Sequence, residues 1–157
     1  MAFQTSGSFT VDVDRETAFG VIGDAVRVAQ CIPGCTELTE LSPGRYSAVL
    51  TNDVAFITLR FKVIVEVLKM EPSNAIEAKI TGDTIGLAGR VTASAGLQLS
   101  EVGPKQTQVR YTSNVSLAGK LGGLGEPVFR AKSADVARQF GVNLKAAIET
   151  LVSKTSV

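Results

Sequence analysis

Two cysteines, Cys31 and Cys35, flank an Ile-Pro-Gly turn and are the first candidates for metal or disulfide chemistry. A structural zinc site takes four ligands, and the sequence has no third cysteine and no histidine to complete the set. A disulfide across the turn is sterically feasible, but a reducing cell keeps thiols reduced. We therefore expect no metal and no bridge, and two buried thiols that act as small apolar side chains beside a tight turn.

Four glycines, Gly119, Gly122, Gly123 and Gly125, crowd a short stretch that could wrap a phosphate. Their spacing matches neither the phosphate-binding loop nor the dinucleotide fingerprint. The stretch is typical of a flexible connection. It could also serve as a hinge that lets the following segment shift to admit a ligand.

Candidates for catalysis are few. The absence of histidine removes the commonest general base near neutral pH. Most acidic residues fall in predicted turns or at outward-facing strand positions. Only Tyr111, Ser113 and Ser133 place polar groups in the predicted interior, where they could polarise a carbonyl. We expect them instead to hydrogen-bond a ligand head group, and we expect no catalytic residue.

Composition favours a binding protein of a single domain over residues 1–157, expected in the cytoplasm. Hydrophobic residues make up 45% of the chain, yet no run approaches the ~18 apolar residues of a membrane span. No signal peptide is visible at the start. Sixteen basic residues balance 15 acidic ones and only 6% are aromatic, which argues against nucleic-acid binding.

A long C-terminal helix over Glu126–Lys154 is the element around which the rest is arranged. Pro127 suits a first helical position, and Gly141 is its one weak point, costing roughly 1 kcal/mol against alanine. Apolar residues recur at helical spacing and form one stripe. They are Phe129, Val136, Ala137, Phe140, Leu144, Ala147, Ile148 and Leu151.

Everything upstream is predicted as strand, apart from two short helices over 14–23 and 24–29 that should cap the sheet rather than form core. Alternating apolar residues predict strands over 3–13, 36–42, 45–52, 56–70, 86–101 and 106–118, with a further one that ends at Gly82. Short connections make neighbours antiparallel. The result is an α+β fold, with a seven-stranded curved antiparallel sheet around one long helix.

The inward face of strand 86–101 is centred on small residues, which predicts either a cavity or a closely packed helix; the pattern alone leaves both open. We expect Phe140 to be buried against strand 56–70. The way in should lie near the turn 31–35 or the approach 119–125. The expected ligand-binding residues are Ile57, Leu59, Phe61, Leu87, Val91, Ala93, Ala95, Tyr111, Phe129, Ser133, Val136 and Phe140.

The order strand, two short helices, six strands and long helix resembles the START-like, Bet v 1-like or helix-grip superfamily, also called SRPBCC. Within it, the sequence is similar to the G-subunit family of carbon monoxide dehydrogenase over nearly its whole length. The matching motifs are Cys31-Ile32-Pro33-Gly34-Cys35, Tyr111-Thr112-Ser113-Asn114-Val115, Ala118-Gly119-Lys120-Leu121 and Leu124-Gly125, followed by the helix with Phe140 and Leu144.

This resemblance implies a non-catalytic accessory protein beside a molybdenum-containing hydroxylase of the carbon monoxide dehydrogenase type. It would carry a bound quinone or lipid in its cavity and work at the inner face of the membrane. Some members continue to an apolar anchor, whereas this sequence stops at Val157. Relatives often carry a second bulky residue where this one has Gly141, which implies a wider pocket or a bent helix. The alternatives are a START-like enzyme of the aromatic cyclase type and a pure protein-docking subunit with a filled core.

Overall fold

The computed structural model describes residues 2–54, 57–86, 89–119 and 125–155, with side chains through residue 150. Its strands and helices follow the predicted order. They are β1 (Ala2–Val11), α1 (Arg15–Ile22), α2 (Ala25–Cys31), β2 (Cys35–Ser42), β3 (Arg45–Val54), β4 (Ile57–Glu71), β5 (Ala75–Thr84), β6 (Gly89–Gly103), β7 (Gln106–Gly119) and α3 (Glu126–Thr155).

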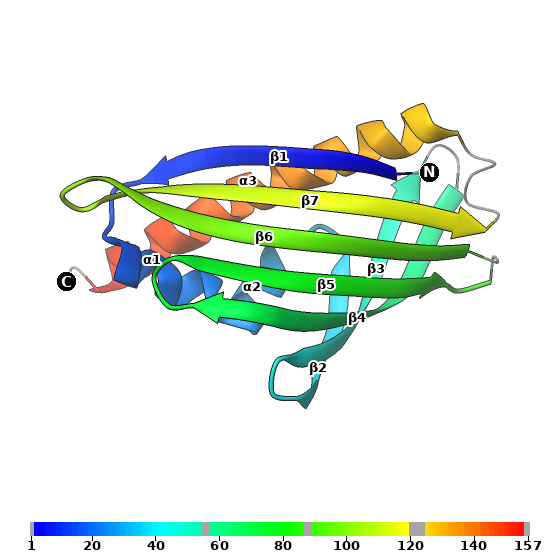
Figure 1. Ribbon diagram of the computed structural model, residues 1–157, viewed down its shortest axis with the longest axis horizontal. Helices are drawn as coiled ribbons and strands as arrows, with labels where there is room; N and C mark the ends of the chain where they lie inside the picture. The colour runs from blue at the N-terminus through cyan, green and yellow to red at the C-terminus, as the bar shows by residue number, and fades with distance from the viewer. Residues whose placement is uncertain (1, 55–56, 87–88, 120–124, 156–157) are drawn as a thin grey trace.

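The seven strands form one antiparallel sheet in the order β1-β7-β6-β5-β4-β3-β2. Each strand from β2 to β7 pairs with its neighbour in the chain, as short hairpin connections dictate. The first strand instead pairs with the last, after α1 and α2. Helix α3 crosses one face of the sheet obliquely, beside β1, and also contacts α1, α2 and β3 (Figure 1). The predicted helix-grip α+β fold is confirmed.

Side-chain caps begin both short helices. The Asp14 carboxylate accepts hydrogen bonds from the backbone N–H and the hydroxyl of Thr17 at the start of α1. Asp24 accepts from the N–H groups of Val26 and Arg27 at the start of α2. Each carboxylate pairs N–H groups that the first helical turn leaves without a backbone partner.

The turn between the cysteines is fastened to β3. Gly34 has φ +80°, and a Cβ on it would clash with the carbonyl oxygen of Thr51. The Thr51 N–H donates to the Gly34 carbonyl at 3.0 Å. Glycine is required here because only it combines a left-handed backbone with such a close approach.

Two separate groups of buried apolar side chains hold the sheet to the helices. The large core contains Val11, Val13, Ala18, Val21, Ile22, Cys31, Ile76, Leu99, Val109, Leu144 and Ile148. The small core contains Phe3, Val54, Leu59, Leu117 and Phe129. Because α1 and α2 supply four members of the large core, the expectation that they only cap the sheet is wrong.

Candidate functional site

The middle of the sheet carries a row of apolar side chains on the face toward α3. Strand register aligns Tyr46, Val65, Ile80, Ala93 and Val115, one from each strand from β3 to β7. Cross-strand neighbours in register share one face of a sheet. The row ends at Phe3 of the small core, which lies on the helix side.

These central side chains are only half-buried, although a helix lies on their side of the sheet. None of the five residues of the row reaches full burial, and neither do Phe61, Val91 and Ala95 beside it. Val63 on the same face is buried. The sheet and α3 therefore leave accessible apolar surface between the two cores. We call this region the central groove.

Helix α3 shows the same pattern along its length. Phe129 near its start is buried in the small core, and Leu144 and Ile148 are buried in the large core. Between these positions Ser133 and Val136 remain half-buried. The helix is thus anchored at both ends and spans the groove in between.

Tyr111 stands between sheet and helix at the border of the large core. Its directly paired neighbour on β1 is Gly7, and a Cβ there would clash with the tyrosine hydroxyl. On α3, a Cβ on Gly141 would lie 2.6 Å from the same oxygen. The tyrosine ring packs edge-on against Phe140 at a centroid distance of 6.0 Å and, tilted, against Phe9 at 6.4 Å. Two glycines thus make room for this ring.

Hydroxyl groups supply the polar character of the groove. The Thr5 and Ser113 hydroxyls share a hydrogen bond of 2.6 Å between β1 and β7. Among the described residues, Tyr111 Oη has no hydrogen-bond partner in the protein. The groove is therefore apolar with a few neutral hydrogen-bonding groups along the β1–β7 side, an arrangement that suits a ligand with a neutral oxygen.

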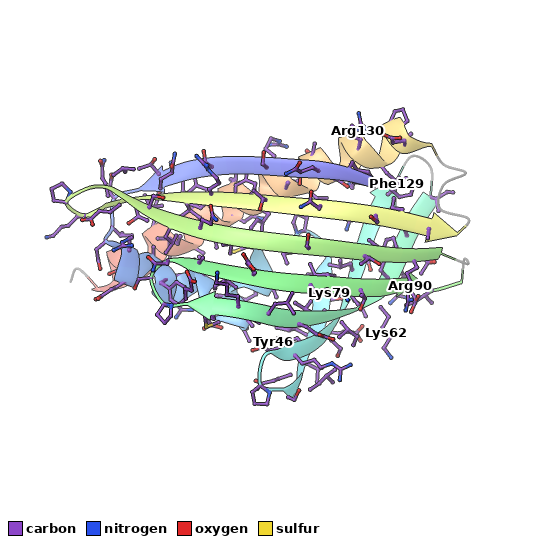
Figure 2. The ribbon with its side chains drawn as sticks, viewed as in Figure 1. Tyr46, Lys62, Lys79, Arg90, Phe129 and Arg130 are labelled. Atoms are coloured by element: carbon purple, nitrogen blue, oxygen red, sulfur yellow. The ribbon has the colours of Figure 1, made fainter. Side chains whose placement is uncertain are left out.

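The structure separates the predicted ligand-binding residues into groups. Phe61, Val91, Ala93, Ala95, Tyr111, Ser133, Val136 and Phe140 are half-buried on the groove side or at its border. Leu59 and Phe129 are instead buried in the small core. Phe129 lies at the start of α3 (Figure 2). Ile57 is 42% exposed at the end of β4. Leu87 lies outside the described residues.

The expected placement of Phe140 is wrong in two respects. Its ring is half-buried rather than buried, and its aromatic partner is Tyr111 on β7 rather than a residue of β4. The cause is the oblique path of α3, which runs beside β1. Sequence reasoning also missed Thr5 and Tyr46. Alternation placed their strands, but only the register shows that they belong to the groove.

A hollow of about 540 Å³ opens between α1, α2 and the strands β2 to β4. Its lining is Phe19, Gly20, Gly23, Asp24, Ala25, Val26, Glu40, Tyr46 and Met70. The turn 31–35, one expected way in, is instead tied down: the Cys31 carbonyl accepts a hydrogen bond of 3.0 Å from the Asn143 side chain of α3. The other, 119–125, lies mostly outside the described residues.

The cysteines are free thiols in the structure. Cys31 Sγ donates to the Arg27 carbonyl within α2 at 3.3 Å. Burial raises the pKa of both thiols above the ordinary value. Within the described ranges, no three His, Cys, Asp or Glu side chains cluster as metal ligands.

Charged side chains gather away from the groove. Lys62, Lys79 and Arg90 lie on the face of the sheet opposite α3 (Figure 2). Arg90 pairs with Asp83 at 3.3 Å. On α3, a hydrogen bond from Arg138 lowers the pKa of the Asp135 carboxyl. None of the described helices is long and apolar enough to cross a membrane.

The sequence profile of the G-subunit family of carbon monoxide dehydrogenase (CoxG) matches residues 7–149. No curated protein gives a significant match. Among solved structures, a conserved protein from Geobacillus kaustophilus is similar with a TM-score of 0.83 and 21% identity, over 94% of this chain and 96% of that one.

Two further structures share the fold at lower identity. A START superfamily protein from Mycobacterium smegmatis has a TM-score of 0.72 and 15% identity over 94% of this chain and 98% of its own. The Zhui aromatase/cyclase from Streptomyces sp. R1128 has a TM-score of 0.70 and 16% identity over 97% and 96%. At these identities the likeness shows a shared START-like fold.

Proposed function

The chain belongs to the CoxG family of carbon monoxide dehydrogenase, and on that premise we propose that it binds a hydrophobic small molecule, a quinone or a lipid, in the central groove without transforming it. The observation that carries the proposal is the row from Tyr46 to Val115, whose apolar side chains face α3 but remain half-buried. Apolar surface that a fold leaves accessible between two closed cores is typical of a ligand site.

The polar groups of the groove support binding rather than chemistry. Thr5, Ser113 and Tyr111 offer neutral hydroxyls, which can orient a carbonyl or hydroxyl of a ligand. A hydrolytic or proton-transfer mechanism calls for a base with a pKa near neutrality or an activated nucleophile. None of the five side chains of the central row, from Tyr46 to Val115, is a carboxylate or a cysteine.

Membership of the family supports an accessory role. We propose that the protein serves a molybdenum-containing enzyme of the carbon monoxide dehydrogenase type, and that it passes a quinone or lipid between this enzyme and the membrane by peripheral contact at the inner face, in the cytoplasm. The arrangement of the sheet supports this proposal. The apolar ligand surface lies on one face of the sheet, and the cations Lys62 and Lys79 lie on the other. A partner enzyme that contacted the charged face would therefore not compete with the ligand.

A cyclase-type enzyme is the second candidate, favoured by one observation. Tyr111 Oη has no protein hydrogen-bond partner among the described residues, and the Zhui aromatase/cyclase shares the fold. A tyrosine hydroxyl could donate to a substrate carbonyl and promote ring closure. Recovery of the bound molecule unchanged after prolonged incubation would favour the carrier, whereas a cyclised product that disappears in a Tyr111→Phe variant would favour the enzyme.

The test of the carrier is to fill the groove. Ala93→Leu and Ala95→Leu should each weaken decylubiquinone binding by about tenfold or more, equivalent to about 1.4 kcal/mol. Both should leave the denaturant midpoint unchanged, because the added methyl groups enter accessible space. Ser94→Leu, between them on the opposite face, is the matched control and should change neither quantity.

Two results would contradict the proposal. Over-packing a dense interior costs about 1–3 kcal/mol, so a matching loss of stability in the alanine variants would indicate a filled core. If the parent protein also retains no quinone or lipid when its solvent extract is examined by mass spectrometry, a docking subunit would be the better description.

A further inference from the structure

The hollow between α1, α2 and strands β2 to β4 is not part of the groove proper, but it adjoins it. Its sheet side is formed by Glu40, Tyr46 and Met70. Glu40 and Tyr46 are directly paired between β2 and β3, so both project to the same face of the sheet. That face is the one toward the helices, because Tyr46 is also paired with Val65.

Tyr46 belongs to both spaces. It lines the hollow, and it is the first member of the row that continues through Val65, Ile80 and Ala93 to Val115. Each residue along this row is half-buried, so every position between the hollow and the groove keeps part of its surface accessible. The neighbouring row toward the large core, which contains Val67, Ala78 and Ala95, is half-buried as well, and burial is reached one row further, at Ile76.

The rim of the hollow carries apolar side chains that are exposed to solvent. Val26 on α2 is 54% exposed and Met70 on β4 is 48% exposed. Helix α1 presents Gly20 to the hollow, and a Cβ built there has no atom within 4 Å. Two carboxylates also line the hollow, Asp24 and Glu40, and Asp24 is occupied by its cap on α2 and by Arg27 at 3.6 Å.

We propose that this hollow is the mouth through which an apolar ligand reaches the central groove, with Tyr46 at the threshold and Tyr111 at the inner end. The inference rests on the proposed function. An apolar ligand that entered here would move over apolar side chains on the helix-facing side of the sheet. It would reach the hydroxyls of β1 and β7 only at the far end of the row.

The sequence provides its own reporters of such a path. It has no tryptophan and only two tyrosines, Tyr46 and Tyr111, so intrinsic fluorescence arises at the two ends of the proposed route. Quinones quench aromatic fluorescence at short range. Tyr111→Phe leaves a reporter at the mouth, and Tyr46→Phe leaves one at the inner end. The affinity of each variant for decylubiquinone is measured first by equilibrium dialysis.

Rapid mixing with decylubiquinone should then quench Tyr46 first, at a rate proportional to quinone concentration. Tyr111 should be quenched in a later phase that levels off as the concentration rises. In the Tyr46→Phe background, Gly20→Leu should slow both binding and release at Tyr111 by about tenfold, a barrier increase of about 1.4 kcal/mol. The equilibrium affinity should stay the same, because an obstructed passage affects both directions equally.

Gly20→Ala is the matched control, since it gains the same helix propensity without filling the hollow. Quenching of Tyr111 before Tyr46, or an unchanged binding rate with Gly20→Leu, would contradict entry through the hollow. Neither result would contradict binding in the central groove. Absence of decylubiquinone binding at equilibrium in the parent protein, together with a solvent extract that contains neither quinone nor lipid, would overturn the proposed function itself, and the mouth with it.

Discussion

At the scale of single residues, the unusual position is Tyr111. Its ring fills the distance between sheet and helix at the border of the large core, and this is feasible because Gly7 and Gly141 both lack a side chain. A glycine in the interior of α3 would otherwise be a weakness. The contact with Tyr111 gives this glycine a structural reason. The Tyr111 ring also occupies the place beside Phe140 where the resemblance implies a second bulky residue.

Gly141→Ala tests this account. Helix propensity alone would stabilise the variant by about 1 kcal/mol. The new Cβ would instead lie 2.6 Å from Tyr111 Oη and 2.8 Å from the ring, so we expect a net loss of about 1–2 kcal/mol, within the usual cost of over-packing. Denaturant unfolding gives the value. In a Tyr111→Ala background the same substitution should be neutral or stabilising, and the same loss there would refute the contact.

The two cysteines make a second residue-scale prediction. Because burial raises the pKa of both thiols, their reactive thiolate forms should appear only at higher pH than for an ordinary cysteine. Labelling of the native protein with a thiol reagent at neutral pH should be much slower than labelling after unfolding. Cys31→Ser/Cys35→Ser should retain quinone. One zinc per chain in the unmodified protein, by elemental analysis, would contradict this.

At the scale of elements, α3 is held at its two ends and left free in the middle. Phe129 anchors it to the small core, and Leu144 and Ile148 anchor it to the large core. The intervening turns carry half-buried residues that face the groove. The amphipathic stripe along this helix therefore serves two purposes: its ends supply stability, and its middle supplies ligand surface.

This division predicts unequal costs along the helix. Leu144 is 0% exposed, so Leu144→Ala should destabilise by about 2–5 kcal/mol, as in other buried sites. Replacing a fully buried phenylalanine with alanine lowers the free energy of unfolding by about 3–5 kcal/mol. Phe140→Ala should lower it by less, because Phe140 is half-buried. Added quinone should recover part of the Phe140→Ala loss and none of the Leu144→Ala loss. The reverse ranking in denaturant unfolding would show that the groove is closed at Phe140.

At the scale of the whole molecule, the two cores keep the sheet and α3 apart at the centre. A sheet that curves around a helix can pack against both ends of the helix and still leave space at its middle. The small side chains of Ala93 and Ala95 on β6 enlarge this space. The free protein then exposes apolar surface inside its own fold. Occupying this surface should stabilise the whole domain, because burial of apolar area is the main favourable term in folding.

Ligand should therefore raise the stability of the entire protein by mass action. At a free concentration of decylubiquinone 100-fold above its Kd, the free energy of unfolding should rise by about 2.7 kcal/mol. The denaturant midpoint with and without quinone measures this. With its affinity about tenfold weaker, Ala95→Leu should show an increase of only about 1.4 kcal/mol at the same quinone concentration, while Ser94→Leu should keep the full increase. An equal increase in both variants would place the ligand outside the groove.

The sequence alone determined the elements and their faces. Alternation in strands and the 3.6-residue stripe of α3 are local consequences of backbone geometry, so the seven strands, the long helix and the inward parity of residues such as Phe61 and Ala93 could be predicted. The family motifs were equally local, and the profile over residues 7–149 confirms the resemblance that they indicated.

Only the tertiary structure decided which inward residues meet. Burial of Leu59 and Phe129, the pairing of Phe140 with Tyr111, and the membership of Thr5 and Tyr46 in the groove all depend on strand register and on the oblique path of α3. Parity shows the face on which a side chain lies, but not how far the opposite element is from it. That distance is fixed by the two cores at the ends, and it is what separates a packed interior from a groove.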